Sequence, residues 1–194
     1  MAFEGPHADL SASAIAHEAA AHRALLDGDA ETARRELLAA VAAYRASWEV
    51  APPGSWGRLI GMLKAAILAG PQEAAAAARI ASGAVGPQDT SPPAAYVVAL
   101  CGLILRDDAA AIRGAEGMCG GTEAFVRTAD AIEALALLEA ERYADAVAEI
   151  VTSFETRDEH LTGVAIADTA LMLQCLAAER GLDARPGPSP VLPG

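Results

Sequence analysis

Residues 133–155, which read EALALLEAERYADAVAEIVTSFE, contain the clearest helical pattern of the chain. Leu137 and Leu138 come before a short turn. After the turn, apolar side chains recur at steps of three or four residues, at Tyr143, Ala146, Val147, Ile150, Val151 and Phe154. This spacing places them on one face of an α-helix, while Asp145, Glu149 and Glu155 fall outside that face. The stretch therefore predicts two helices joined by a tight turn.

The same arrangement recurs along the chain. Four pairs of large apolar residues each precede a short turn and another helix, with first members 42, 37 and 33 positions apart: Leu25-Leu26, Ile67-Leu68, Ile104-Leu105 and Leu137-Leu138. These intervals are close to the length of a helix-turn-helix repeat. The last unit, with Ala136, Tyr143 and Ala146, resembles the layout of tetratricopeptide proteins, although the other units lack that family's Leu-Gly and aromatic positions. The sequence predicts an all-α fold of antiparallel helical hairpins, stacked as a right-handed tetratricopeptide-like array with one concave face.

Turn residues divide the chain into about nine helices, and no segment alternates with the period of a strand. Gly28 is expected to end one helix in the left-handed conformation, and Asp29 to cap the next. Ser91 is expected to cap a helix that starts with proline. We expect one helical domain over residues 1–181 and a proline-rich tail over 182–194, which is either extended and docked or disordered.

The composition limits the classes of partner. Hydrophobic residues make up 53% of the 194 residues but aromatic residues only 4%, so alanine supplies much of the apolar content. The formal charge of −12 argues against nucleic acid and against anionic membranes as partners. It favours a basic protein partner, or serves only to keep the protein in solution. Without a basic apolar leader before Leu10, and with three cysteines expected to be reduced thiols, the expected location is the cytoplasm.

One aromatic and basic group stands out around the break Pro52-Pro53-Gly54. It consists of Trp48, Trp56, Arg58 and Lys64, and Lys64 is the one lysine of the chain. If the break brings the helix ends together, these side chains line a pocket or an interface, where tryptophan and arginine are favoured. The alternative is that both tryptophans fill the core between the two helices.

Two acidic features are further candidates. Asp158, Glu159 and His160 follow the amphipathic helix and form an acid–base group, a contact patch, or simply a linker or helix cap. Asp168 lies in the apolar stretch 164–178, which is expected to be a buried helix. A buried carboxylate needs partners, so we expect Asp168 to bond Thr169, a backbone amide or an arginine.

Motifs for catalysis, metals and cofactors are missing from the sequence. It contains no glycine-rich phosphate loop, nucleophile elbow or zinc-protease motif. His17 and His22 are five residues apart, whereas two metal ligands on one helix face need a separation of three or four. We therefore expect no metal, no cofactor and no enzymatic activity.

The C-terminal third resembles a known family. The resemblance rests on the segments 133–148, 161–181 and 191–193, including Ala170, Leu171, Leu173 and the end Cys175-Leu176-Ala177-Ala178-Glu179-Arg180-Gly181. They look like the end of the immunity protein 49 family, bacterial proteins inferred to neutralise toxins. The turn at 25–29, leading to Tyr44 and Trp48, is similar too.

Two functions follow as expectations. The first is a non-enzymatic protein-binding module, as the resemblance to a toxin-neutralising family implies. The second is a helical small-molecule-binding or accessory biosynthetic protein with a pocket near Trp48 and Trp56. A scaffold that forms homo-oligomers is a further possibility.

Overall fold

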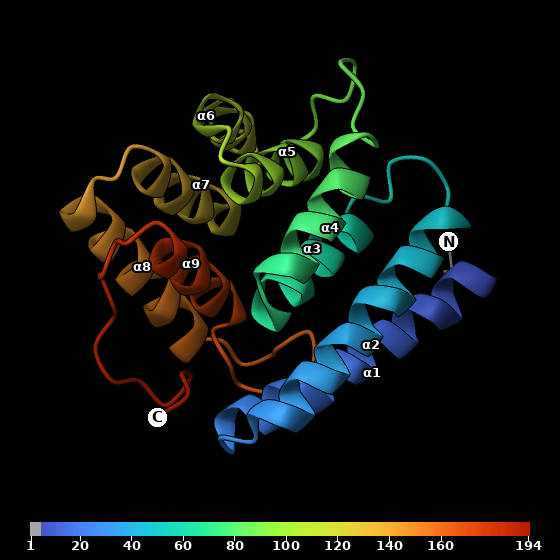
Figure 1. Ribbon diagram of the computed structural model, residues 1–194, viewed down its shortest axis with the longest axis horizontal. Coiled ribbons are helices and arrows are strands. Elements are labelled where there is room, and N and C mark those ends of the chain that lie inside the picture. The colour runs from blue at the N-terminus through green and yellow to red at the C-terminus, as the bar shows by residue number, and fades with distance from the viewer. Residues whose placement is uncertain (1–4) are drawn as a thin grey trace.

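The computed structural model describes residues 5–194, and over that range it is all-helical, with nine helices and no strand (Figure 1). The predicted fold class is thus confirmed. The helices are α1 (Pro6–Leu26), α2 (Ala30–Glu49), α3 (Gly57–Ala69), α4 (Pro71–Ser82), α5 (Pro92–Leu105), α6 (Asp108–Met118), α7 (Glu123–Ala136), α8 (Ala140–Glu155) and α9 (Asp168–Glu179).

Local chemistry sets the helix ends where the sequence indicated. Gly28 has a φ of 75°, and the Asp29 carboxylate accepts a hydrogen bond of 3.0 Å from the Thr32 amide at the start of α2. Ser91 caps α5 by accepting from the Ala94 amide at 3.4 Å. These side chains satisfy amide groups that the first turn of a helix leaves without partners.

Two helix ends differ from the sequence prediction. Leu137 and Leu138 were expected before the turn, but α7 already ends at Ala136, because Leu138 adopts a left-handed φ of 57° and the Glu139 amide bonds back to the Ala134 carbonyl at 2.9 Å. α9 begins at Asp168 and not at Val164, since residues 164–167 are not helical. Asp168 is therefore the first residue of the helix in which it was predicted, and only the predicted start of that helix at Val164 was wrong.

Small side chains let the helices pack closely. A Cβ atom added to Gly102 of α5 would lie 2.4 Å from the backbone nitrogen of Ala111 in α6. One added to Gly114 of α6 would lie 2.5 Å from the backbone nitrogen of Ala99 in α5. Both distances are far inside van der Waals contact, so α5 and α6 touch backbone to backbone at glycine. The alanine-rich composition therefore serves close helix packing.

The helices follow one another as packed neighbours, and α3, α5 and α7 also pack successively on each other. This pattern fits a stack of hairpins, while its right-handed twist stays a prediction. α9 lies against α3, α7 and α8, so it covers part of the surface formed by the first helices of the hairpins (Figure 1). The tail is extended and docked: Val191 is buried, and its carbonyl accepts from the Ala167 amide at 2.8 Å.

Candidate functional site

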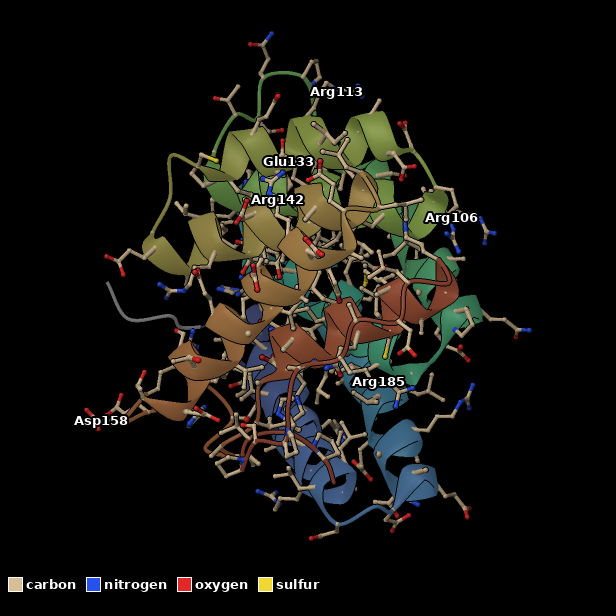
Figure 2. The ribbon with its side chains drawn as sticks, turned by 90° about the vertical axis from the view of Figure 1, so that its left-hand side faces the viewer. Arg106, Arg113, Glu133, Arg142, Asp158 and Arg185 are labelled. Atoms are coloured by element: carbon tan, nitrogen blue, oxygen red, sulfur yellow. The ribbon has the colours of Figure 1, made fainter. Side chains whose placement is uncertain are left out.

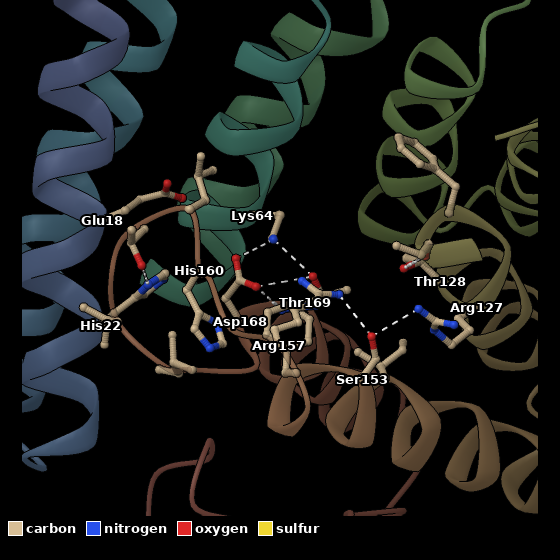
Figure 3. Close-up of a pocket in the computed structure, with 18 of the residues that line it drawn as sticks. Glu18, His22, Lys64, Arg127, Thr128, Ser153, Arg157, His160, Asp168 and Thr169 are labelled. Atoms are coloured by element: carbon tan, nitrogen blue, oxygen red, sulfur yellow. Dashed lines mark hydrogen bonds and ion pairs between the residues drawn. The ribbon is translucent and has the colours of Figure 1, made fainter. Parts of the chain in front are cut away.

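A pocket of about 240 Å³ lies where α1, α3, α5, α7 and α8 meet the segment before α9 (Figure 3). Its walls combine apolar side chains with an unusual number of polar and charged ones. The polar and charged side chains of the wall carry carboxyl, amino, guanidinium, imidazole or hydroxyl groups; they are Glu18, His22, Lys64, Tyr96, Arg127, Thr128, Ser153, Arg157, His160, Thr162, Asp168 and Thr169. The apolar wall includes Phe125, Ile150, Phe154 and Val164.

An ion pair between Lys64 and Asp168 forms one side of this pocket. The Lys64 ammonium also donates to the Thr169 hydroxyl at 3.1 Å, and the Asp168 carboxylate accepts from the Thr169 amide at 2.7 Å. Burial works against both charges, but each partner outweighs it: the pKa of Asp168 is lowered by Lys64, and the pKa of Lys64 is raised by Asp168. Both groups are therefore charged at neutral pH. The pair joins α3 to the start of α9.

Two further titratable groups come from α1. The Tyr44 hydroxyl donates to the Glu18 carboxyl group at 2.6 Å, and burial raises the pKa of Glu18 to about 7. His22 Nδ1 lies 3.1 Å from the Thr162 hydroxyl, and burial lowers the pKa of the imidazole. Near neutral pH, the Glu18 carboxyl group is thus present in both its protonated and its charged form, while the His22 imidazole is mostly neutral.

Two arginines meet at a single hydroxyl group on the opposite side of the pocket. Ser153 Oγ accepts from Arg127 Nη2 at 3.1 Å and from Arg157 Nη2 at 3.3 Å (Figure 3). The Arg157 guanidinium also stacks on Phe154, 3.8 Å from the ring centroid, and Phe154 stacks with His160 at 6.0 Å. This side of the pocket therefore carries positive charge beside aromatic surface.

The structure brings together three of the candidate residues found in the sequence: Lys64, His160 and Asp168 all line the pocket. Asp158 and Glu159 do not line it; both are exposed, and Asp158 points away from the molecule (Figure 2). Asp168 bonds Thr169 and its amide, as expected, but its charged partner is the lysine and not an arginine.

The two tryptophans lie elsewhere. Trp48 and Trp56 pack on each other with ring centroids 5.3 Å apart, and Trp56 is buried in the core. The buried Arg58 donates through Nε to Ser47 Oγ at 2.7 Å, and Ser47 in turn donates to the His7 carbonyl at 2.7 Å. None of these residues lines the 240 Å³ pocket, so the structure separates Lys64 from the rest of its sequence group.

Sequence reasoning missed five titratable pocket residues: Glu18, His22, Tyr96, Arg127 and Arg157. A signal existed for the first two. Glu18 and His22 share the buried face of α1 with Ala14 and Ala21, at helical steps of three and four. A glutamate on an otherwise apolar face requires a partner. No comparable local signal marks the two arginines.

Outside the pocket, α8 presents an acidic surface. Glu141, Asp145 and Glu149 are spaced four residues apart, are all exposed, and have no ion-pair partner within residues 5–194. We call these three residues the α8 acidic stripe. Three acids nearby do have an ion-pair partner: Arg142 binds Asp130 at 2.5 Å, Glu139 at 3.1 Å and Glu133 (Figure 2).

No family model, curated protein or solved structure matches this chain. Across residues 5–194, no helix is long and apolar enough to cross a membrane, and no cluster of three or more histidine, cysteine or acidic side chains is arranged to hold a metal ion.

Proposed function

We propose that the protein is a non-enzymatic binding module that engages a basic protein partner through the α8 acidic stripe. The observation that carries this proposal is the repeated carboxylate at Glu141, Asp145 and Glu149. Like charges four residues apart destabilise a helix by about 0.2–0.5 kcal/mol per pair. The stripe thus weakens the fold that carries it, and a basic partner would remove that repulsion.

The charge of the whole chain supports the same proposal. With a formal charge of −12, the protein attracts positively charged surfaces over a distance and speeds encounter with them. Stacked helical hairpins offer extended surfaces for such partners. Two residues of the stripe, Glu141 and Asp145, lie within the segment 133–148, which resembles the immunity protein 49 family, and Glu149 follows it directly. The specific version of the proposal is therefore a bacterial protein that neutralises a toxin, acting in the cytoplasm.

A triple variant, Glu141→Gln/Asp145→Asn/Glu149→Gln, tests the proposal. Its matched control is Asp27→Asn/Glu31→Gln/Glu116→Gln, which removes three exposed carboxylates that also lack ion pairs. Both variants raise the formal charge by three. Extracts of the source organism are passed over each immobilised protein, and any basic protein that is retained is purified for titration calorimetry at several salt concentrations.

We expect a basic protein that binds the wild type and the control with similar affinity, and the stripe variant at least tenfold more weakly. Affinity should fall as salt rises, because exposed charges are screened. The proposal fails if every retained protein binds both triple variants equally. If the partner is a toxin, adding the wild-type protein should abolish its activity, whereas the stripe variant should not.

The alternative of small-molecule binding is favoured by a different observation, the polar pocket beside Lys64 and Asp168. This pocket lies apart from the two tryptophans.

A further inference from the structure

Two buried polar groups of the pocket have no partner in the chain. The Tyr96 hydroxyl and Nδ1 of His160 are both shielded from solvent and make no hydrogen bond within residues 5–194. Tyr96 is only 7% exposed, and both residues line the pocket. Buried polar groups in folded proteins are almost always paired, and leaving one unpaired costs about 1–3 kcal/mol. These two groups point to a polar partner that enters the pocket.

The charge of the pocket shows which kind of partner fits. Lys64 is already matched by Asp168, but Arg127 and Arg157 share only the neutral Ser153 hydroxyl. Arg157 has no ion pair within the described residues, and the carboxylate of Glu123, 3.5 Å from Arg127 Nη1, is 92% exposed. Arg157 is exposed as a residue, but desolvation of its guanidinium group lowers its pKa below the ordinary value. This outweighs the Asp168 charge, which raises that pKa, and the neighbouring Arg127 charge lowers it further. Two converging guanidinium groups match a carboxylate or phosphate.

The size and the apolar surface of the pocket restrict the class of ligand further. A volume of about 240 Å³ has room for roughly eight water molecules, judged by their share of the liquid. It is smaller than the pockets that hold drug-sized ligands. Phe125 and Phe154 supply apolar wall, and Phe125 packs edge-on against Tyr96 with ring centroids 5.7 Å apart. An apolar or aromatic body therefore fits beside the hydroxyl group of Tyr96.

We propose that this pocket binds a small organic acid. Its carboxylate lies between the guanidinium groups of Arg127 and Arg157, its apolar body lies against Phe125 and Phe154, and a hydroxyl or carbonyl oxygen bonds the Tyr96 hydroxyl. The site takes a ligand of opposite charge to the partner of the α8 acidic stripe. It goes beyond the proposed function and does not depend on it.

Titration calorimetry with benzoate, 4-hydroxybenzoate, benzamide and inorganic phosphate at low salt tests the proposal. We expect benzoate to bind at one site and to bind at least tenfold more tightly than the uncharged benzamide and than phosphate, which has no apolar body. Arg127→Gln/Arg157→Gln should weaken benzoate at least tenfold. The control Arg79→Gln/Arg113→Gln, which changes two exposed arginines that lack ion pairs, should leave its affinity unchanged.

A second variant tests the hydroxyl contact of the ligand without removing a charge from the pocket. Tyr96→Phe removes one hydroxyl group, and Tyr143→Phe removes another unpartnered buried hydroxyl that does not line this pocket. We expect 4-hydroxybenzoate to bind severalfold more tightly than benzoate to the wild type and to Tyr143→Phe, and to lose that advantage in Tyr96→Phe. The proposal is overturned if neither acid binds saturably, if the two arginine variants bind benzoate equally, or if phosphate binds more tightly than benzoate.

Discussion

Arg58 and Lys64 are two cations on the same helix, and their surroundings differ; Arg58 is buried, whereas the Lys64 side chain is 16% exposed. Arg58 is held by a neutral relay through Ser47 Oγ to the His7 carbonyl. Lys64 is held by the charge of Asp168 and faces a pocket with unpartnered polar groups. A cation held inside the fold can thus serve to join helices or to build a site, and its neighbours decide which.

The largest effect should come from breaking the ion pair at the pocket. Asp168→Ala leaves the Lys64 ammonium buried without a counter-charge, and we expect a loss of about 3–5 kcal/mol in the free energy of unfolding, measured by urea denaturation. The double variant Lys64→Met/Asp168→Leu should recover most of this loss, since no buried charge is left. The exposed Asp158→Ala serves as a control and should change stability by less than about 0.5 kcal/mol. A stability loss in Asp168→Ala no larger than that of the control would contradict a buried pair.

Stability at the pocket should also depend on pH through Glu18. The unfolded chain loses this proton near pH 4.5, whereas the folded protein keeps it up to about pH 7. Between these values the folded state binds more protons, so stability from Glu18 falls as pH rises. From pH 5 to pH 8 the loss should be about 2–3 kcal/mol, at 1.36 kcal/mol per pKa unit.

Glu18→Gln should remove this part of the pH dependence, as seen in urea denaturation at both pH values. Glu31→Gln, at an exposed position of α2, should retain it. An identical pH dependence in the wild type and Glu18→Gln would show that the Glu18 proton is not linked to folding.

The other side of the comparison is tested by Arg58→Met. The variant loses the hydrogen bond to Ser47 while keeping much of the side-chain volume, so we expect a loss of about 1.5–3 kcal/mol, the range for hydrogen bonds to charged groups. Benzoate affinity should not change, because Arg58 is not part of the pocket. A folded Arg58→Met protein with altered benzoate affinity would show that the two regions are coupled.

The smallest effect should come from Tyr96→Phe and have the opposite sign. Removing an unpartnered buried hydroxyl group relieves its desolvation, so thermal or urea denaturation should show a gain of up to about 1 kcal/mol. Tyr143→Phe should show a similar gain, since its hydroxyl group is also buried and unpartnered. A clear loss of stability in Tyr96→Phe alone would mean that its hydroxyl group already has a strong partner, such as ordered water.

The fold was predictable from the sequence because its signals are local. Gly28, Asp29 and Ser91 act within one turn of the chain, and the apolar stripe of α8 repeats over a few residues. The start of α9 was misjudged because the apolar residues 164–167 have the same composition in a packed irregular segment as in a helix.

The pocket was only partly predictable because its contacts are not local. Lys64 and Asp168 are more than a hundred positions apart, and no local sequence pattern near either residue predicts the other as its partner. The sequence did contain evidence against grouping Lys64 with Arg58. Two side chains that are six residues apart on an α-helix point about 120° apart around its axis. Arg58 and Lys64 must therefore face different neighbours.

The contact between His22 and Thr162, 140 residues apart, affects how the whole chain unfolds. In an open row of repeats each unit touches only its neighbours, and the ends fray independently. Here α1 and α3 are tied through His22 and Lys64 to the segment around α9, which makes the row close on itself. We therefore expect one cooperative transition, in which hydrogen exchange at α1 and at α9 reports the same opening free energy.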